Sequence, residues 1–284
     1  MRLANLDGRA TIVTDAGGVD VGRASGGRFG PELPALYDDW GAFRAAADDV
    51  VAAAGPAGAQ PIDDARLGPP SPRPAQVFGI GLNYKAHAAE TGATIPKIPA
   101  TFTKFPTCLT GPFGEVVLPS GNVDWEVELV LVIGTLGRGV AERDGWAHVA
   151  GVTVGQDLSE RVVQRRAGAQ FSLGKSYPGF GPTGPWLVTP DELEHPDDLA
   201  LGCSIDGEVM QDSSTADMAF KVPQLVAELS AIVPLLPGDV VFTGTPSGVG
   251  AARQPPRFLA PGQVLETWVD GVGSMRHRLV GARS

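Results

Sequence analysis

Acidic residues stand at alternate positions where a long apolar run begins. Asp124, Glu126 and Glu128 occupy this pattern, and only apolar residues fill positions 129–133. Alternate side chains of a strand point to the same face, so the three carboxylates would share one side. A buried carboxylate is costly unless it is paired with or bound to a cation. The segment is therefore typical of a cation site, with a solvated edge strand as the alternative interpretation.

Asp157 follows a second β-rich run at residues 152–154. Taken alone, an aspartate at this place is most simply a helix cap. Together with Glu126 and Glu128 it makes a set of three hard oxygen ligands. Such a set suits Mg²⁺, Mn²⁺ or Ca²⁺ and does not suit zinc, which prefers nitrogen and sulfur. Three protein ligands would leave coordination positions for water and substrate.

His87 and Glu90 lie three residues apart in a predicted short helix at residues 85–91, with Asn83 as its candidate cap. At this spacing the two side chains lie on one helix face. A histidine oriented by a carboxylate can activate water as a general base. The alternative is an ordinary surface pair on a short helix.

A glycine-rich loop and two lysines complete the candidate set. The loop ends the segment 237–250, and its backbone amides could approach an anion closely. The segment lacks the lysine of a phosphate-binding P-loop and the glycine spacing of a dinucleotide-binding turn. Lys104 and Lys175 could each offer a point charge to a carboxylate, and a solvated lysine is the alternative for each.

The elements that must position these residues fall into two predicted domains, residues 1–70 and residues 71–284. The first contains two alternating runs, 2–6 and 9–14, and a helical periodicity over 32–54. Four prolines within residues 69–74 preclude regular structure and predict a linker. Beyond the linker we predict strands at 77–81, 127–133, 152–154, 186–188, 240–243 and 264–269, and helices at 85–91, 159–167 and 220–232. Many strands and few helices predict a mostly β (α+β) fold.

Composition narrows the classes of partner and the location. The net charge of −10 argues against nucleic acid and anionic membranes as partners, and an anionic substrate would need a local cation. Cys108 and Cys203 fit no metal or redox spacing, as expected of free thiols in a reducing compartment. The first residues do not form a secretory signal, and no apolar run is long enough to span a membrane. We therefore expect a soluble, cytoplasmic protein.

Read together, the segments resemble the fumarylacetoacetate hydrolase family over residues 67–280. Each motif is weak alone, and the ordered set is specific. The motifs are Gly81-Leu82-Asn83-Tyr84, His87-x-x-Glu90, Asp124-x-Glu126-x-Glu128-Leu129, Asp157-x-Ser159-x-Arg161-x-x-Gln164, Gly174-Lys175-Ser176 and Thr243-Gly244-Thr245-Pro246-x-Gly248-Val249-Gly250. One departure is His277, which stands close to the place where the family usually carries an asparagine.

The resemblance implies a catalytic domain of coiled mixed β-sheets, a roll or barrel, behind a small N-terminal α+β domain. It implies that Glu126, Glu128 and Asp157 bind Mg²⁺ or Mn²⁺ and that the chain forms a homodimer. The implied catalytic residues are His87, Glu90 and Lys175. The implied substrate-binding residues are Arg161, Gln164, Thr245, Tyr84 and Lys104.

The reaction implied by this resemblance acts on a small 2-oxo acid. We expect hydrolysis of a carbon–carbon bond in a 3-acylpyruvate, with His87, oriented by Glu90, taking a proton from water. Two other activities of the family stay open, namely decarboxylation of oxaloacetate-like acids and tautomerisation or isomerisation of hydroxydienoic acids. A non-catalytic metal- or metabolite-binding protein on the same fold is the alternative from another class.

Overall fold

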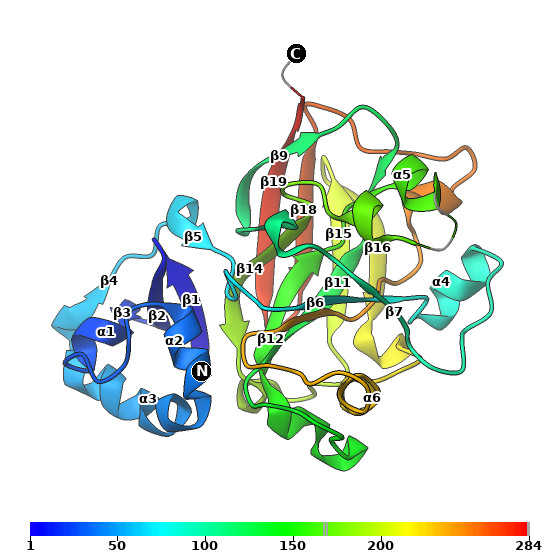
Figure 1. Cartoon of the computed structure of the whole chain (residues 1–284). Helices are drawn as coiled ribbons and strands as arrows, with labels where there is room; N and C mark the ends of the chain where they lie inside the picture. Colours follow the sequence, from blue (N-terminus) through cyan, green and yellow to red (C-terminus); the bar gives the residue numbers. More distant parts are fainter. Residues whose placement is uncertain (167, 169, 283–284) are drawn as a thin grey trace.

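The computed structural model describes residues 1–166, 168 and 170–282. Two large sheets form the body of the molecule and few helices accompany them, which confirms the predicted mostly β (α+β) fold (Figure 1). Both sheets are mixed, since β17 pairs parallel with β6 and β19 pairs parallel with β9, while the other neighbours are mostly antiparallel. No helix in the described part of the chain is both long and apolar enough to cross a membrane.

The larger sheet has the strand order β4-β3-β2-β1-β14-β12-β11-β17-β6-β7, with β5 beside β1 and β8 beside β14. Its strands are β1 (Arg2–Leu6), β2 (Arg9–Thr14), β3 (Gly17–Asp20), β4 (Ala59–Gln60), β5 (Leu67–Gly68), β6 (Val77–Gly81), β7 (Ala100–Thr103), β8 (Leu109–Thr110), β11 (Val127–Ile133), β12 (Val149–Gln156), β14 (Gly181–Val188) and β17 (Val240–Phe242). The second sheet has the order β16 (Glu208–Ser214), β15 (Ala200–Ile205), β18 (Val264–Val269), β19 (Gly273–Gly281) and β9 (Phe113–Leu118). A two-stranded pair joins β10 (Val123–Asp124) to β13 (Ser159–Glu160).

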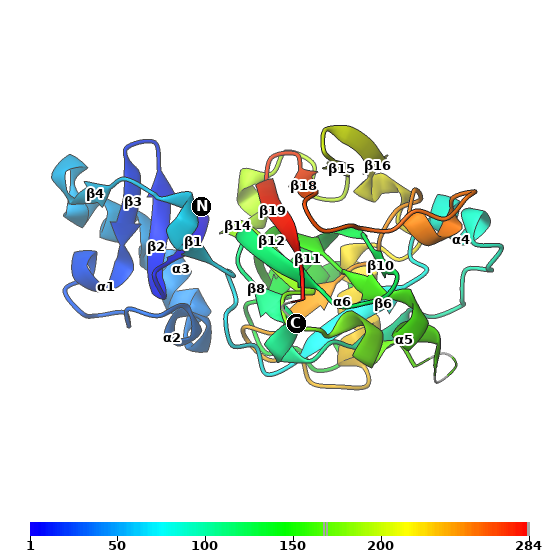
Figure 2. The ribbon, with the colours of Figure 1, turned by 90° about the horizontal axis from the view of Figure 1, so that it is seen from above.

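Helices are short, apart from one in the N-terminal segment. The α-helices are α1 (Val21–Ala24), α2 (Leu33–Asp38), α3 (Trp40–Ala54), α4 (Lys85–Glu90), α5 (Arg161–Arg166) and α6 (Val222–Ser230). The 3₁₀ turns are η1 (Pro56–Gly58), η2 (Asp64–Arg66), η3 (Pro106–Cys108), η4 (Glu142–His148), η5 (Ser172–Lys175), η6 (Pro190–Glu192), η7 (Thr215–Asp217) and η8 (Gly250–Ala252). In both views α4 and α5 lie at the end of the molecule opposite the N-terminal segment (Figures 1 and 2).

The predicted elements agree with the structure at most places. Strands predicted at 2–6, 9–14, 77–81, 127–133 and 264–269 coincide with β1, β2, β6, β11 and β18. The helix predicted over 32–54 is two helices, because Asp39 has a non-helical backbone (φ −137°, ψ 53°) between α2 and α3. Aspartate favours such caps over helix interiors. Of the helix predicted at 159–167, the first two residues form β13 and residue 167 lies outside the described residues.

The N-terminal segment continues the larger sheet. Strand β1 pairs antiparallel with β14, with Leu3 opposite Leu187. The blue N-terminal elements therefore lie directly against β14 (Figures 1 and 2). Residues 69–76 between them and β6 form neither helix nor strand, as the prolines predict. The division of the chain at residue 70 into two domains stays a prediction.

Two apolar cores flank the central strand β11, which lies between β12 and β17. Its odd-numbered residues, such as Leu129 and Leu131, pack in the core shared with the second sheet. Its even-numbered residues Val130 and Val132 pack in a core that also contains Trp40 and Phe43 of α3. All seven residues of β11 are buried, so the edge-strand alternative is wrong.

Candidate active site

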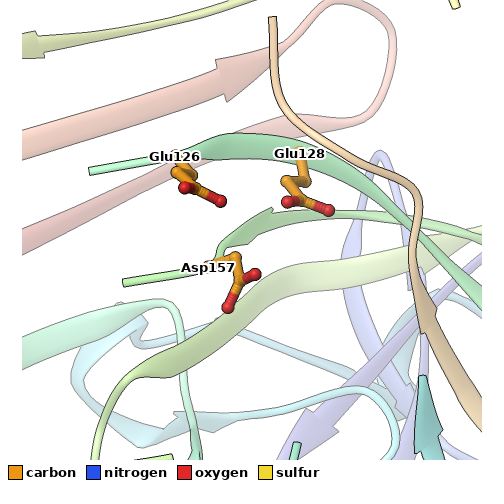
Figure 3. Close-up of side chains that lie close together, drawn as sticks. All are labelled: Glu126, Glu128 and Asp157. Atoms are coloured by element: carbon orange, nitrogen blue, oxygen red, sulfur yellow. The ribbon is translucent and has the colours of Figure 1, made fainter. Parts of the chain in front are cut away.

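The strand ladder between β11 and β12 brings the predicted metal ligands together. Glu128 lies opposite Gly155 in this ladder, and the Asp157 amide just beyond it donates to the Glu126 carbonyl oxygen at 2.9 Å. Glu126 and Glu128 share the even-numbered face of their strand, as the alternation predicts. In Figure 3 Glu128 projects from β11, Glu126 stands directly before this strand, and Asp157 stands directly after the neighbouring β12.

The three carboxylates form a compact, buried cluster. One oxygen from each of Glu126, Glu128 and Asp157 lies within 4.8 Å of the others. Their exposed fractions are 6%, 1% and 1%. A cluster of buried anions at this spacing is stable only when cations balance it.

Two buried lysines supply part of this balance. Lys175 Nζ donates to Glu126 Oε2 at 2.7 Å and to Asp157 Oδ2 at 2.5 Å. Lys104 Nζ donates to Asp157 Oδ1 at 2.6 Å and to the Lys175 and Phe180 carbonyl oxygens. Burial would lower the pKa of Lys175, but Asp157 and Glu126 outweigh it and raise that pKa. The solvated-lysine alternative is therefore wrong for both residues.

Arg161 joins the cluster to Asp124. Its Nη1 lies 2.7 Å from Glu126 Oε1, and its Nε and Nη2 donate to Asp124 Oδ2 at 2.8 and 2.6 Å. The same Nη1 donates to Gln164 Oε1 at 3.0 Å. Burial alone would raise the pKa of Glu126, but Lys175 and Arg161 lower it to about 2.

Glu128 is the carboxylate of this group that forms no ion pair with a lysine or arginine of the described residues. Its Oε2 accepts from the Gly244 amide at 2.7 Å, and no lysine or arginine of the described residues pairs with it. Burial, with the charges of Asp157 and Glu126, raises the pKa of Glu128 well above its ordinary value. Four buried carboxylates (Asp124, Glu126, Glu128, Asp157) thus face three cations (Lys104, Lys175, Arg161). A divalent cation fits this all-oxygen set and supplies the missing positive charge.

The dyad predicted from the sequence is formed. His87 Nδ1 lies 2.7 Å from Glu90 Oε1, and the Gly248 amide donates to Glu90 Oε2 at 2.9 Å. Tyr84 stands at the N-cap of α4, so the predicted cap is wrong. Instead, the Asn83 side-chain Nδ2 donates to the Thr243 and Phe220 carbonyl oxygens, which ties the start of α4 to the body of the protein.

The glycine-rich loop uses its amides on the protein's own carboxylates. Gly244 donates to Glu128, Gly248 to Glu90, and Gly250 and Ala251 to Asp124, at 2.7 to 2.9 Å. The loop does bind anions closely, as its composition predicts. These anions belong to the site itself, so the four amides are not available to a substrate carboxylate.

A cavity of about 770 Å³ opens beside the cluster and lies within the size range of ligand pockets. Seven of the predicted site residues line it: His87, Glu90, Glu126, Arg161, Gln164, Lys175 and Thr245. The other four, Glu128, Asp157, Tyr84 and Lys104, are buried and do not line it. The Tyr84 hydroxyl has no hydrogen-bond partner among the described residues. The predicted contacts of Tyr84 and Lys104 with substrate stay a prediction.

Among the cavity-wall residues that were not predicted from the sequence, four are aromatic or cationic. Phe102 and Phe171 pack edge to face with ring centroids 5.8 Å apart, and Arg165 and Arg253 add two cationic side chains. Phe102 precedes Lys104 by two residues, but nothing in the local pattern shows that its ring faces a cavity. Arg253 follows the glycine-rich loop, where its charge alone gives no sign of its direction.

A family model described as fumarylacetoacetate (FAA) hydrolase, C-terminal, matches residues 76–280. The human protein named oxaloacetate tautomerase FAHD2A, mitochondrial, is 44% identical over 214 residues, which are 74% of this chain and 68% of the human protein.

Two crystal structures superpose along the whole length. A Mycobacterium smegmatis protein provisionally named HpcE is 53% identical with a TM-score of 0.91, and each chain covers all of the other. Maleylpyruvate hydrolase from Sphingobium sp. SYK-6, in complex with manganese(II) and pyruvate, is 30% identical with a TM-score of 0.81, again over the whole of both chains.

Proposed function

The chain belongs to the fumarylacetoacetate hydrolase family, and we propose that it hydrolyses a carbon–carbon bond of a 3-acylpyruvate with the help of a divalent cation. The observation that carries the proposal is the 2.7 Å contact between His87 and Glu90 in the wall of the cavity that Glu126 and Lys175 also line. An oriented imidazole beside a cation site is suited to activating water against a bound 2-oxo acid.

Glu126, Glu128 and Asp157 would hold Mg²⁺ or Mn²⁺. The manganese(II) and pyruvate in the related maleylpyruvate hydrolase support this part of the proposal. The cation, when bound, supplies a Lewis acid that polarises the 2-oxo group and stabilises the negative charge of the departing enolate.

The dyad residues would move the proton. Glu90 holds Nδ1 of His87, which leaves Nε2 to take a proton from a water molecule in the cavity. The water oxygen bonds to the distal carbonyl carbon of the acylpyruvate. The bond from that carbon to C3 then breaks, its electron pair stays on C3, and His87 returns the proton there. The products are a carboxylic acid and pyruvate, so the atoms of substrate and water balance.

Lys175 and Thr245 would orient the substrate. Two of the three N–H groups of Lys175 are used on Glu126 and Asp157, so one remains to donate to an oxyanion. Thr245 Oγ1 accepts from Gln211 Nε2 at 2.8 Å, which leaves the hydroxyl proton to donate to a substrate oxygen. Gln164, beside Arg161 in the cavity wall, is a further donor.

A second candidate is tautomerisation of an oxaloacetate-like acid, which the 44% identity to the human tautomerase favours. The same residues would serve, with His87 carrying a proton between C3 and the 2-oxo oxygen and without attack by water. The cavity of about 770 Å³, lined by Phe102 and Phe171, is far larger than a four-carbon acid needs. Its size favours a substrate longer than oxaloacetate.

The test is His87→Ala, assayed for release of acetate and pyruvate from acetylpyruvate in the presence of Mn²⁺. We expect the rate to fall by roughly 100- to 10,000-fold, as for loss of a general base, with unchanged Mn²⁺ affinity. His195→Ala is the matched control, because His195 pairs with Glu194 on the surface outside the cavity. A His87→Ala variant that keeps the full rate would refute the proton-transfer role.

A further inference from the structure

Gln211 of β16 is a buried polar residue between the second sheet and the glycine-rich loop, with an exposed fraction of 1%. Both ends of its side chain are used. Oε1 accepts from the Val127 amide at 2.9 Å, and Nε2 donates to the Pro246 carbonyl oxygen at 2.9 Å and to Thr245 Oγ1 at 2.8 Å. One side chain of the second sheet therefore joins the start of β11 to the glycine-rich loop.

The two backbone contacts fix which end of the Gln211 side chain faces the loop. A backbone amide only donates, so the group that faces Val127 is the carbonyl oxygen. A backbone carbonyl only accepts, so the group that faces Pro246 is the NH₂. The contact of this NH₂ with Thr245 makes the threonine oxygen the acceptor. The direction of this hydrogen bond thus follows from the backbone groups around it.

The hydroxyl proton of Thr245 is left for a ligand. Thr245 lines the cavity, and its hydroxyl donates to no acceptor among the described residues. A free hydroxyl rotates and serves either as donor or as acceptor. The bond from Gln211 occupies one lone pair of Oγ1 and favours the donor role. Thr245 is therefore set to bind an oxygen atom of a ligand.

The loop lies directly on β16, which brings Thr245 within reach of Gln211. Gly248 has a φ of +103°, and a Cβ there would lie 2.4 Å from the Met210 carbonyl oxygen and 3.2 Å from Gln211 Cγ. Nη2 of Arg253 donates to the same Met210 oxygen at 2.9 Å from the other end of the loop. The place of the Thr245 hydroxyl is therefore set by the strand beneath it.

We infer that Gln211 is a positioning residue for the proposed reaction, which fixes the Thr245 hydroxyl as a donor to the carboxylate of the 2-oxo acid. Val127, whose amide Gln211 holds, lies between Glu126 and Glu128. The side chain that orients Thr245 thus also holds the backbone from which both metal ligands project. The inference rests on the proposed function, since it takes the ligand of Thr245 to be the 2-oxo acid.

A double-mutant cycle tests whether Gln211 acts through Thr245. Gln211→Met has nearly the same length and removes both hydrogen-bonding ends. We expect KM for acetylpyruvate with Mn²⁺ to rise roughly 10-fold, as for a lost hydrogen bond to a charged group, with kcat little changed. Thr245→Val should raise KM similarly, and the double variant should be no worse than Thr245→Val. Multiplication of the two effects would overturn the inference.

Gln156→Met is the matched control for the cycle. Gln156 is also buried, its Oε1 accepts from the Glu126 amide at 2.9 Å, and its Nε2 donates to Thr267 Oγ1 at 3.1 Å. It makes the same kind of link without contacting the loop, so its effect on KM should be the same factor in the wild type and in Thr245→Val. If this effect also disappears in Thr245→Val, the coupling is a general disturbance of β11 and the inference falls.

Pyruvate binding keeps the test independent of turnover. Pyruvate carries the 2-oxo acid group and lacks the bond that the proposed hydrolysis would break. In calorimetric titrations of the Mn²⁺-loaded protein, Gln211→Met should weaken pyruvate binding roughly 10-fold, and should have no effect in Thr245→Val. Gln211→Asn, which is polar but too short for both contacts, replaces Gln211→Met if thermal unfolding shows that the methionine variant does not fold.

The two readouts separate this inference from the proposed function. If acetylpyruvate is not cleaved, the proposed hydrolysis fails, and the pyruvate titrations still decide the role of Gln211. Equal weakening of pyruvate binding in the wild type and in Thr245→Val, or no weakening in either, would overturn the inference.

Discussion

Glu128 is the residue at which the charge of the site is least balanced. It is buried beside Glu126 and Asp157, and its hydrogen bond comes from the neutral Gly244 amide. A buried charge without a cationic partner destabilises the folded state. The imbalance is the reason for placing a divalent cation here, since the other carboxylates already have lysine or arginine partners.

Glu128→Gln keeps the shape of this side chain and removes its charge. We expect Mn²⁺ affinity to fall by roughly 100-fold or more, because a ligand oxygen is lost. In the metal-free protein the variant should be at least as stable as the wild type, because an unmatched buried charge is gone. Calorimetric titration and thermal unfolding measure the two effects.

Glu115→Gln serves as the control for this experiment. Glu115 is exposed on β9 and belongs neither to the carboxylate cluster nor to the cavity wall. It should alter neither Mn²⁺ affinity nor thermal stability. Unchanged Mn²⁺ affinity in Glu128→Gln would contradict the assignment of this glutamate as a ligand.

At the scale of single residues, the sequence predicts the ligands better than their neighbours. Strand alternation and residue type are sufficient to place Glu126 and Glu128 on one face. The two lysines that pair with the cluster, Lys104 with Asp157 and Lys175 with Glu126 and Asp157, come from distant segments, so their burial follows from the tertiary fold alone. Arg253 shows the same limit, since its contact with Trp125 joins residues on separate loops.

At the scale of elements, the glycine-rich loop after β17 organises the site. Gly244 has a φ of +100°, and a Cβ there would lie 2.7 Å from Asn83 Cβ and 3.0 Å from the Ile80 carbonyl oxygen. A side chain at this position would therefore meet both a strained backbone and a steric clash. The loop can bring its amide to Glu128 only with glycine at this position.

Gly244→Ala and Gly262→Ala form a matched pair for testing this role. Gly262 has a similar φ of +95°, but nothing lies within 4 Å of the Cβ position. We expect Gly262→Ala to lower the free energy of unfolding by about 1 kcal/mol, from the backbone alone. Gly244→Ala should cost about 2 kcal/mol more, from overpacking, and should weaken Mn²⁺ binding. Equal losses in urea unfolding would show that the contacts of Gly244 carry no strain.

The local sequence pattern predicted the first and last residues of β6, β11 and β18 correctly, because each contains a run of apolar residues. The pattern failed at Asp39, where the apolar periodicity runs on through a break between two helices. It also gave no indication that the loop amides would bind Glu90 and Asp124, because those bonds join segments more than 120 residues apart.

At the scale of the whole molecule, the N-terminal segment and the catalytic body share a sheet and a core. Leu3 of β1 and Phe43 of α3 pack in one cluster with Val130 of β11 and Phe242 of β17. The proline-rich linker predicts that the N-terminal segment is separate from the rest of the chain. The pairing of β1 with β14 joins residues about 180 positions apart, so the local sequence pattern cannot predict it. Homodimer formation and a cytoplasmic location stay predictions.

The most direct test of the whole account is turnover of acetylpyruvate, 2,4-dioxoheptanedioate and oxaloacetate by the wild-type protein, with Mg²⁺ and with a chelator. We expect Mg²⁺-dependent release of pyruvate together with acetate or succinate from the two acylpyruvates, and loss of this activity with the chelator. Interconversion of the keto and enol forms of oxaloacetate, or its conversion to pyruvate and carbon dioxide, without cleavage of either acylpyruvate, would contradict the hydrolase assignment.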